Sequence, residues 1–192
     1  GLEALYPKPS LSKPAIGHKI YPYLLKGVRI DRADQVWSTD ITYIRLNHGF
    51  IYLVAIMDWF SRYVLSYAFS TTLDKDFCLK ALRHALKVAT PEIFNSDQGS
   101  QFTSPKYTQR LQDADVKISM DGRGRALDNV FIERLWRTLK CEDIYLKDYA
   151  TVDELYEGLE CYLAYYDRKR PHQALDYRTP YDVYYEAYEV PN

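Results

Sequence analysis

The stretch VWSTDITYIRLNHGFIYLVAIMD, residues 36–58, decides the fold. It holds two runs of β-branched and aromatic residues, 36–46 and 49–58, with Asn47 and His48 between them, and a third such run follows at 63–70. Short apolar runs of this composition, bounded by turn residues, are typical of strands. The three runs therefore predict a three-stranded meander.

Beyond the meander, helical and strand patterns alternate along the chain. Residues 75–89 have apolar side chains at helical spacing after Asp74, which suits an N-cap. Further predicted elements are a strand at 92–96, a helix at 104–114 with proline in its first turn, a strand at 116–120, a helix at 128–140 and a helix at 151–167 that begins with a capping box. This order of elements predicts a mixed α/β fold.

Composition excludes several classes of protein. A chain of 192 residues with 47% hydrophobic content is long enough for one ordinary core, so a single compact unit is the simplest expectation. No apolar run approaches the roughly 18 residues needed to cross a bilayer, so we expect a soluble cytoplasmic protein with no membrane partner. The cysteines Cys78, Cys141 and Cys161 lie far apart, which predicts reduced thiols rather than a disulfide frame or a zinc site.

The overall charge argues against a nucleic-acid binder, but its local distribution does not. Lys and Arg number 25 against 26 Asp and Glu, a formal net charge of −1. Residues 122–140, GRGRALDNVFIERLWRTLK, nevertheless carry five basic residues against two acidic ones. The basic residues are Arg123, Arg125, Arg134, Arg137 and Lys140. This strip could face a polyanion, or it could be a solvated helix face with mixed charges.

Three acidic residues occupy positions that call for a cation. Asp40 lies inside a predicted strand, where a buried and unpaired carboxylate costs several kcal/mol. Asp97 follows the fourth predicted strand, at the end where open α/β sheets place their ligands. Glu133 lies on the 128–140 helix, on a face shared with Arg137 and Lys140. If the first and fourth strands are neighbours, the acids converge, and divalent ions with oxygen ligands would relieve their repulsion.

Each acid also has a simpler interpretation. Asp97 could form an Asx-type turn before Gly99. Glu133 could form a salt bridge with Arg137, four residues later on the same helix. Asp58 is a reserve metal ligand, although its place between two predicted strands favours a role in a turn.

Four motifs resemble the signatures of insertion-sequence transposases, specifically the insertion-sequence-three family in the retroviral integrase superfamily. They are QVWSTDITYI (35–44), SDQGSQF (96–102), SMDGRGRALDNVFIERLWRTLK (119–140) and RPHQALDYRTPYDVY (170–184). In this family Asp40, Asp97 and Glu133 match an Asp-Asp-Glu triad. The resemblance implies an RNase H-like α/β fold, like the retroviral integrase catalytic core, with a five-stranded mixed sheet and flanking helices.

The resemblance also implies an activity. The family's catalytic protein is a DDE-type polynucleotidyl transferase that nicks DNA at element ends and joins the freed 3′-hydroxyl to a target strand. It implies that Asp40, Asp97 and Glu133 hold Mg²⁺, for which Mn²⁺ could substitute, and that the partners are element-end DNA, target DNA and at least one further copy of the chain. The expected DNA contacts are Lys140, Arg137, Asn129, Arg123, Arg125, Arg170 and His172. Two alternatives remain open, an RNase H-like nuclease and a non-catalytic DNA-binding remnant.

Three segments are expected along the chain. Residues 1–35, with Pro7, Pro9, Pro14 and Pro22, predict an extended N-terminal arm. The resemblance implies that this arm is the tail of an upstream DNA-binding region. Residues 36–170 are the expected integrase core, and 171–192 a C-terminal extension packed on it. The resemblance places the protein in a bacterial cytoplasm, associated with the nucleoid when bound to DNA.

Overall fold

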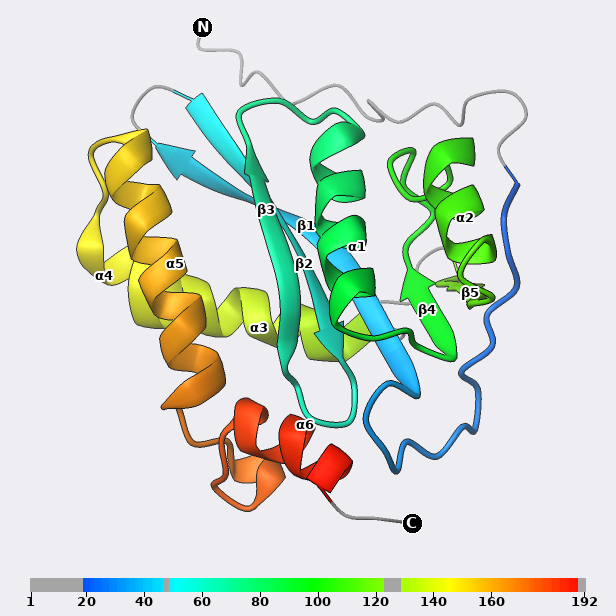
Figure 1. Cartoon of the computed structure of the whole chain (residues 1–192). Coiled ribbons are helices and arrows are strands. Elements are labelled where there is room, and N and C mark those ends of the chain that lie inside the picture. Colours follow the sequence, from blue (N-terminus) through cyan, green and yellow to red (C-terminus); the bar gives the residue numbers. More distant parts are fainter. Residues whose placement is uncertain (1–18, 47–48, 123–128, 190–192) are drawn as a thin grey trace, which may run out of the picture.

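A five-stranded mixed sheet with strand order β3-β2-β1-β4-β5 forms the centre of the molecule (Figure 1). The computed structural model describes residues 19–46, 49–122 and 129–189. The predicted DNA contacts Arg123 and Arg125 lie outside these ranges. The strands are β1 (Val36–Leu46), β2 (Gly49–Asp58), β3 (Val64–Ser70), β4 (Ile93–Ser96) and β5 (Lys117–Met120).

Helices flank the sheet. They are α1 (Asp76–Val88), α2 (Pro105–Gln112), α3 (Val130–Leu139), α4 (Tyr145–Lys147), α5 (Val152–Arg168) and α6 (Pro180–Glu189), with a π-helical turn at Lys140–Ile144 and a 3₁₀ turn at Gln173–Leu175. The five predicted strands and four predicted helices are confirmed, with ends shifted by at most two residues. The sequence did not reveal the π-helical turn, α4 or α6. No helix in the described ranges is both long and apolar enough to span a bilayer.

The pairing of the strands sets the position of the acids. β1 pairs antiparallel with β2, with Asp40 opposite Ala55, and parallel with β4, with Ser38 opposite Asn95. The first and fourth strands are therefore neighbours, as the convergence of the acids requires. When this parallel register is continued by two residues, Asp40 comes level with Asp97, just beyond the end of β4.

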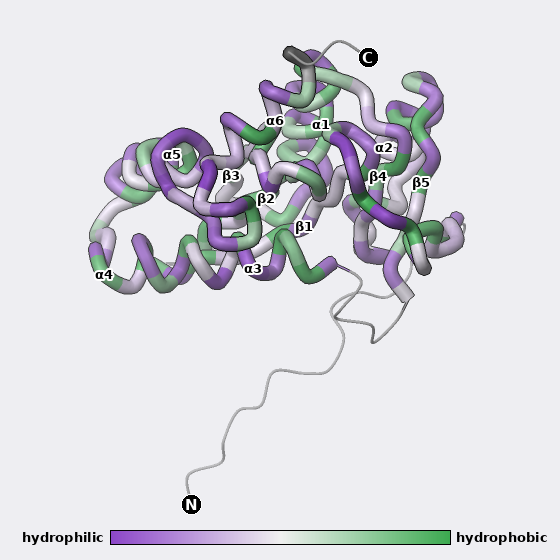
Figure 2. The backbone as a smooth tube through the Cα atoms, turned by 90° about the horizontal axis from the view of Figure 1, so that it is seen from below, coloured by the Kyte–Doolittle hydropathy of each residue, from purple (hydrophilic) through white to green (hydrophobic). Residues whose placement is uncertain are grey.

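Apolar side chains of β2 point alternately into two cores. Val54 and Ile56 pack with α1, whereas Leu53, Ala55 and Met57 pack with α3 and α5. Successive side chains of a strand point to opposite faces, so a strand that is apolar throughout must be covered on both sides. Figure 2 shows α1 and α3 on opposite sides of the sheet. The sheet is thus the middle layer, and α3 is held against β1.

Local capping interactions explain where two helices begin. The N-cap position of α1 is Lys75, one residue after the predicted Asp74. The carboxylate of Asp74 nevertheless accepts hydrogen bonds from the first backbone N–H groups of the helix, those of Asp76 at 2.9 Å and Phe77 at 3.4 Å. At α5, Thr151 and Glu154 form the predicted capping box. Such caps satisfy N–H groups that have no partner within the helix.

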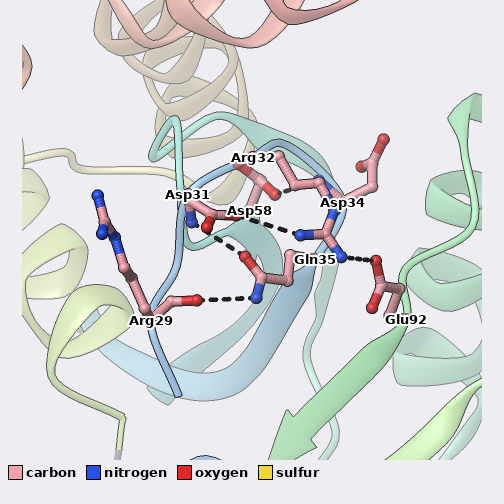
Figure 3. Close-up of polar contacts among 7 residues, drawn as sticks. All are labelled: Arg29, Asp31, Arg32, Asp34, Gln35, Asp58 and Glu92. Carbon is pink, nitrogen blue, oxygen red and sulfur yellow. Dashed lines mark hydrogen bonds and ion pairs between the residues drawn. The ribbon is translucent and has the colours of Figure 1, made fainter. Parts of the chain in front are cut away.

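The segment before β1 is anchored by polar contacts (Figure 3). Arg32 forms ion pairs with Asp31 and Glu92, and the side chain of Gln35 donates a 2.8 Å hydrogen bond to the backbone carbonyl of Arg29. The backbone N–H of Asp34 donates to the carboxylate of Asp58 at 2.9 Å. Residues 19–35 contain no helix or strand, yet these contacts fix their position beside the sheet.

The C-terminal helix packs on the same side as α1. Tyr184 of α6 is 1% exposed and belongs to the core cluster that includes Phe77 and Leu82. Its hydroxyl donates a 2.9 Å hydrogen bond to the carboxylate of Asp34. This contact joins two segments 150 residues apart and fixes α6 near the start of β1.

Candidate active site

Asp40 lies in the middle of β1, at the centre of the candidate site. Its Oδ2 accepts a 2.9 Å hydrogen bond from the indole Nε1 of Trp136 on α3. Burial raises the pKa of Asp40 to about 6, hydrogen bonds from Ile41 and Trp136 oppose the rise, and repulsion by Asp97 and Glu133 adds to it. Repulsion of this kind means that the three carboxylates share one electrostatic neighbourhood.

Asp97 follows β4 in a tight turn. Its Oδ1 accepts a 2.8 Å hydrogen bond from the backbone N–H of Gly99, so the Asx-type turn considered from the sequence is present. A Cβ atom on Gly99 would lie only 2.8 Å from that Oδ1, which explains the glycine. The Asp97 side chain is exposed, but the protein surrounds it closely enough that partial desolvation raises its pKa. The turn therefore fixes the carboxylate without removing it from the site.

Glu133 projects from the first turn of α3 and is exposed. Among the described residues, the salt bridges do not include one between Glu133 and Arg137, so the simpler interpretation of this acid is not realised. Ile132, Leu135 and Leu139, the apolar stripe of the helix, are buried against the sheet. This packing turns the Glu133 side of α3 towards the β1 carboxylate, which explains their electrostatic coupling.

The three acids do not form a closed metal site as their side chains stand. Within the described ranges, no group of three His, Cys, Asp or Glu side chains is close enough together to hold a metal ion. The donor set nevertheless suits a hard divalent ion, since all three groups are carboxylates. Burial is the main cause of the raised pKa of Asp40, and the smaller repulsion from Asp97 and Glu133 is of the kind that a bound cation relieves.

Lys140 lies beside these acids, where α3 passes into the π-helical turn. Burial lowers its pKa, and the charge of Asp40 acts in the opposite direction. Its ammonium group lies 5.3 Å from the centre of the Tyr43 ring. The structure thus brings Lys140 near Asp40, whereas Arg137, one turn earlier, is exposed to solvent.

Asn129 has a partner inside the fold. It is 6% exposed, and its Nδ2 donates a 3.1 Å hydrogen bond to the backbone carbonyl of Thr39, the residue before Asp40. Its Oδ1 is buried and has no hydrogen-bond partner among the residues that the structure describes. Asn129 therefore joins the start of α3 to β1 next to the catalytic strand position.

Arg170 and His172 lie at the far end of α5. Arg170 forms a two-pronged contact with Glu142 of the π-helical turn, with N–O distances of 2.8 and 2.6 Å. His172 packs edge-on against Tyr166, with ring centres 4.7 Å apart. Burial lowers the pKa of His172 to about 4, helped by the charge of Arg170. Both side chains face the protein, and the imidazole is neutral at physiological pH.

Asp58, the reserve ligand, lies away from the other three acids. It is opposite Trp37 in the β1–β2 ladder and is fully buried. Its Oδ1 accepts 2.7 Å hydrogen bonds from both the backbone N–H and the hydroxyl of Ser61, as expected of a turn residue. Burial raises its pKa to about 6.

Sequence reasoning missed Trp136 as a functional residue. Its position in the 128–140 helix, three residues after Glu133, was visible as part of the apolar pattern. The indole N–H that it directs at Asp40 could not be foreseen, since the two residues are 96 positions apart. The available signal was that Trp136, an aromatic residue whose indole can donate a hydrogen bond, lies one helical turn after the predicted active-site residue Glu133.

The sheet order and the flanking helices are those of an RNase H-like fold of the integrase class, and comparison with known proteins agrees. Residues 31–126 and 114–180 each match a family described as Integrase core domain. The chain belongs to the integrase core family. Its curated relatives narrow this to the catalytic domain of DDE-type insertion-sequence transposases, which act in DNA transposition.

The relatives are bacterial. The chain is 31% identical over 177 residues to the transposase for insertion sequence element IS904 of Lactococcus lactis, a match that covers 90% of this chain and 67% of the relative. It is 29% identical to the putative transposase InsK for element IS150 of Escherichia coli, with 90% and 62% covered. It is 31% identical to the transposase for element IS629 of Shigella sonnei, and this match covers 78% of this chain and 51% of the relative. The chain thus spans about two thirds or less of these proteins.

Solved structures support the fold. The HTLV-2 integrase catalytic core domain in complex with magnesium, in its dimeric form, matches with a TM-score of 0.64 at 16% identity, covering 81% of this chain and 99% of that one. A chain of the simian T-cell lymphotropic virus intasome matches with a TM-score of 0.69 at 17% identity, covering 87% of this chain and 59% of that one.

Proposed function

We propose that this chain is the catalytic core that cuts and joins DNA at the ends of an insertion sequence, with Asp40, Asp97 and Glu133 as its metal ligands. The observation that carries the proposal is geometric: the parallel register of β1 and β4 brings Asp40 level with Asp97, and Trp136, on the helix that carries Glu133, donates a hydrogen bond to Asp40. The three acids come from elements far apart in sequence, which supports a shared role.

The triad suits magnesium, with manganese as a substitute, because carboxylate oxygens are the ligands that hard divalent ions prefer. Bound ions would supply activation of the attacking oxygen and stabilisation of the leaving oxygen. The protein's own contribution is orientation. Trp136 holds the Asp40 carboxylate, and the N–H of Gly99 holds that of Asp97.

DNA contacts are assigned by exposure and by position. Lys140 and Arg137 are the proposed phosphate contacts, because one lies beside Asp40 and the other is exposed on α3. Arg123 and Arg125 belong to the same basic strip in the sequence and are proposed to contribute charge. Phosphate contacts of this kind position DNA without reading its sequence.

The other predicted DNA contacts, Asn129, Arg170 and His172, are proposed to hold parts of the protein in position rather than to touch DNA. Asn129 holds the start of α3 on β1, while Arg170 holds the end of α5 on the π-helical turn. The packing of His172 against Tyr166 supports the same assignment. We propose that these residues act on DNA only through the elements they join.

Joining two element ends requires at least two active sites, so we propose that the working form is an oligomer of two or more copies. We further propose that residues 1–35 form an arm leading to an upstream DNA-binding region, that 36–170 are the catalytic core, and that 171–192 complete it. Such a protein would work on DNA in the bacterial nucleoid.

The test of this proposal is a product assay. The chain is incubated with labelled element-end DNA, an unlabelled target duplex and Mg²⁺, and the strands are separated on a denaturing gel. Nicked and joined products support the transposase core. Nicked products without joining would support the hydrolytic nuclease, and absence of both with Mg²⁺ and with Mn²⁺ would contradict catalysis by this chain.

A further inference from the structure

A pocket at the turn between β2 and β3 contains a largely buried arginine, Arg62. The pocket has a volume of about 460 Å³ and lies where this turn meets α6 and the loop before it (Figure 1). Its walls are mostly apolar and include Ile30, Phe60, Phe131, Leu175 and Val183. We propose that this pocket binds an organic carboxylate with an apolar body, and that Arg62 holds the carboxylate.

The first argument is the environment of the Arg62 guanidinium. Burial lowers the pKa of Arg62 to about 10, so the side chain is desolvated but still charged at neutral pH. Its Cζ lies 3.4 Å from the centre of the Phe131 ring, and its Nη1 is buried with no hydrogen-bond partner in the described part of the chain. A buried charge costs free energy unless an opposite charge or hydrogen bonds compensate it.

The acids near Arg62 do not supply that compensation. Asp58 acts on Arg62 through its charge, but its carboxylate accepts hydrogen bonds from Ser61 and from the backbone N–H of Asp34. Asp176 lines the pocket but is exposed. The ion pairs among residues 19–46, 49–122 and 129–189 include no partner for Arg62.

The other polar groups of the lining leave Arg62 as the group that selects charge. Arg178, the second basic residue of the lining, forms an ion pair with Glu186. Trp59 also lines the pocket and is 8% exposed, and its Nε1 has no hydrogen-bond partner among the described residues. The pocket therefore combines a free cation and a buried N–H donor with apolar walls.

A carboxylate suits this pocket better than a phosphate. The guanidinium group donates two parallel hydrogen bonds to the two oxygens of a carboxylate. A phosphate has further charged oxygens, which would lose their hydration against the apolar walls. A volume of about 460 Å³ lies in the range of small-molecule sites, so the walls can take an apolar body beside the carboxylate.

The pocket also gives a role to the last sequence motif, residues 170–184. Residues 174–176, 178 and 183 of this segment line the pocket. The backbone N–H of His172 donates a 3.0 Å hydrogen bond to the carbonyl of Arg178, which closes the loop that carries the wall residue Leu175. Because Phe131 of α3 forms another wall, a bound acid would touch the helix that carries Glu133.

Calorimetric titration of the whole chain with phenylacetate tests the proposal, with phenylacetamide as the uncharged ligand of similar shape. Wild type should bind the acid about tenfold more tightly than the amide, a difference of 1.4 kcal/mol. Arg62→Met keeps an apolar stem against Phe131 and should remove the difference. Arg62→Lys keeps the charge without the planar fork and should reduce the difference to roughly threefold.

Two further variants check the electrostatics. Asp176→Asn should strengthen binding of phenylacetate about twofold, because it removes a like charge from the lining. Asparagine also tolerates the left-handed backbone at this position, where φ is 53°. Arg83→Met is the matched control, since Arg83 is exposed on α1 and absent from the pocket lining, and it should bind both ligands like wild type.

Two more ligands identify the source of the carboxylate. Tighter binding of acetylated alanylphenylalanine than of phenylacetate would support the proposal with a peptide chain end as the ligand, and the reverse order would support it with a free small acid. Equal affinity of wild type for acid and amide, an undiminished difference in either Arg62 variant, or binding of inorganic phosphate as tight as that of phenylacetate would overturn the proposal. The titration contains neither DNA nor metal, so its result is independent of the proposed cutting activity.

Discussion

The indole Nε1 of Trp136 donates a 2.9 Å hydrogen bond to Oδ2 of Asp40, and this contact ties the helix that carries Glu133 to the strand that carries the first acid. The bond favours the ionised carboxylate, and it opposes the increase in pKa caused by burial. A hydrogen bond to a charged group contributes about 1.5 to 3 kcal/mol. Trp136 is thus a positioning residue for the candidate site.

Replacement of Trp136 tests that role. Trp136→Phe keeps most of the buried aromatic surface but removes the donor, so the pKa of Asp40 should rise further above about 6. We expect DNA cutting at pH 7 to fall roughly two- to tenfold, and the acidic limb of the pH–rate profile to move to higher pH. Trp59→Phe, which removes a buried indole N–H with no hydrogen-bond partner in the described part of the chain, is the matched control. A proportional loss of activity at every pH in Trp136→Phe would contradict the assigned role.

Gly99 provides a second test, at Asp97. An added Cβ would lie 2.8 Å from Asp97 Oδ1, so Gly99→Ala must displace the carboxylate that the turn orients. We expect weaker metal-dependent cutting, recovered in part at higher Mg²⁺ concentration, with little change in thermal stability. Ser100→Ala, one residue along the same turn, serves as the control. Wild-type dependence of Gly99→Ala on Mg²⁺ would show that this orientation is unimportant.

The lowered pKa of His172 predicts that the free energy of unfolding depends on pH. Its pKa is about 4 in the folded chain, below the ordinary value near 6.5, so the unfolded chain binds the proton more readily between these pH values. The stabilisation is present above pH 6.5 and is lost as the pH falls towards 4, by roughly 2 to 3 kcal/mol. Urea unfolding across this range should show the loss in wild type and a smaller loss in His172→Gln. The exposed His84 on α1 provides the control variant His84→Gln, which should behave like wild type.

Replacement of Asp58 tests whether this acid has a structural role or binds metal. Its carboxylate is fully buried and accepts hydrogen bonds from Asp34 and Ser61. Asp58→Ala should lower the free energy of unfolding by about 2 to 4 kcal/mol, because donors lose a buried acceptor. The increase in melting temperature produced by Mg²⁺ or Mn²⁺ should persist in this variant. If that increase disappears while the protein remains folded, Asp58 is a ligand after all.

Much of the fold could be predicted from local sequence. Composition and turn residues located the strands, and spacing located α1 to α3 and α5, because these signals act over a few residues. The capping box at Thr151 and Glu154 was readable for the same reason. The π-helical turn after Lys140 carries no comparable signal, and α6 lies in a tyrosine-rich segment whose burial depends on a tertiary contact with Asp34.

The contacts of the candidate site could not be predicted from the sequence. The sequence proposed Asp40, Asp97 and Glu133 as the site, and it presented the Asx turn and the metal ligand as alternatives for Asp97. The structure shows that the turn leaves the carboxylate exposed, so the two roles are compatible. Contacts such as Trp136 with Asp40 and Arg170 with Glu142 bridge residues 96 and 28 positions apart, and side-chain type alone does not specify such pairs.

The most direct test of the central claim is metal-dependent DNA cutting by the chain with each acid changed to its amide. Asp40→Asn, Asp97→Asn and Glu133→Gln should each abolish cutting in Mg²⁺ and in Mn²⁺ while retaining a folded, DNA-binding protein, because catalytic groups that act as a unit fail together. Glu157→Gln, which removes one exposed carboxylate from α5, should cut like wild type. Near wild-type cutting by any one of the three triad variants would contradict the claim that these carboxylates form the active site.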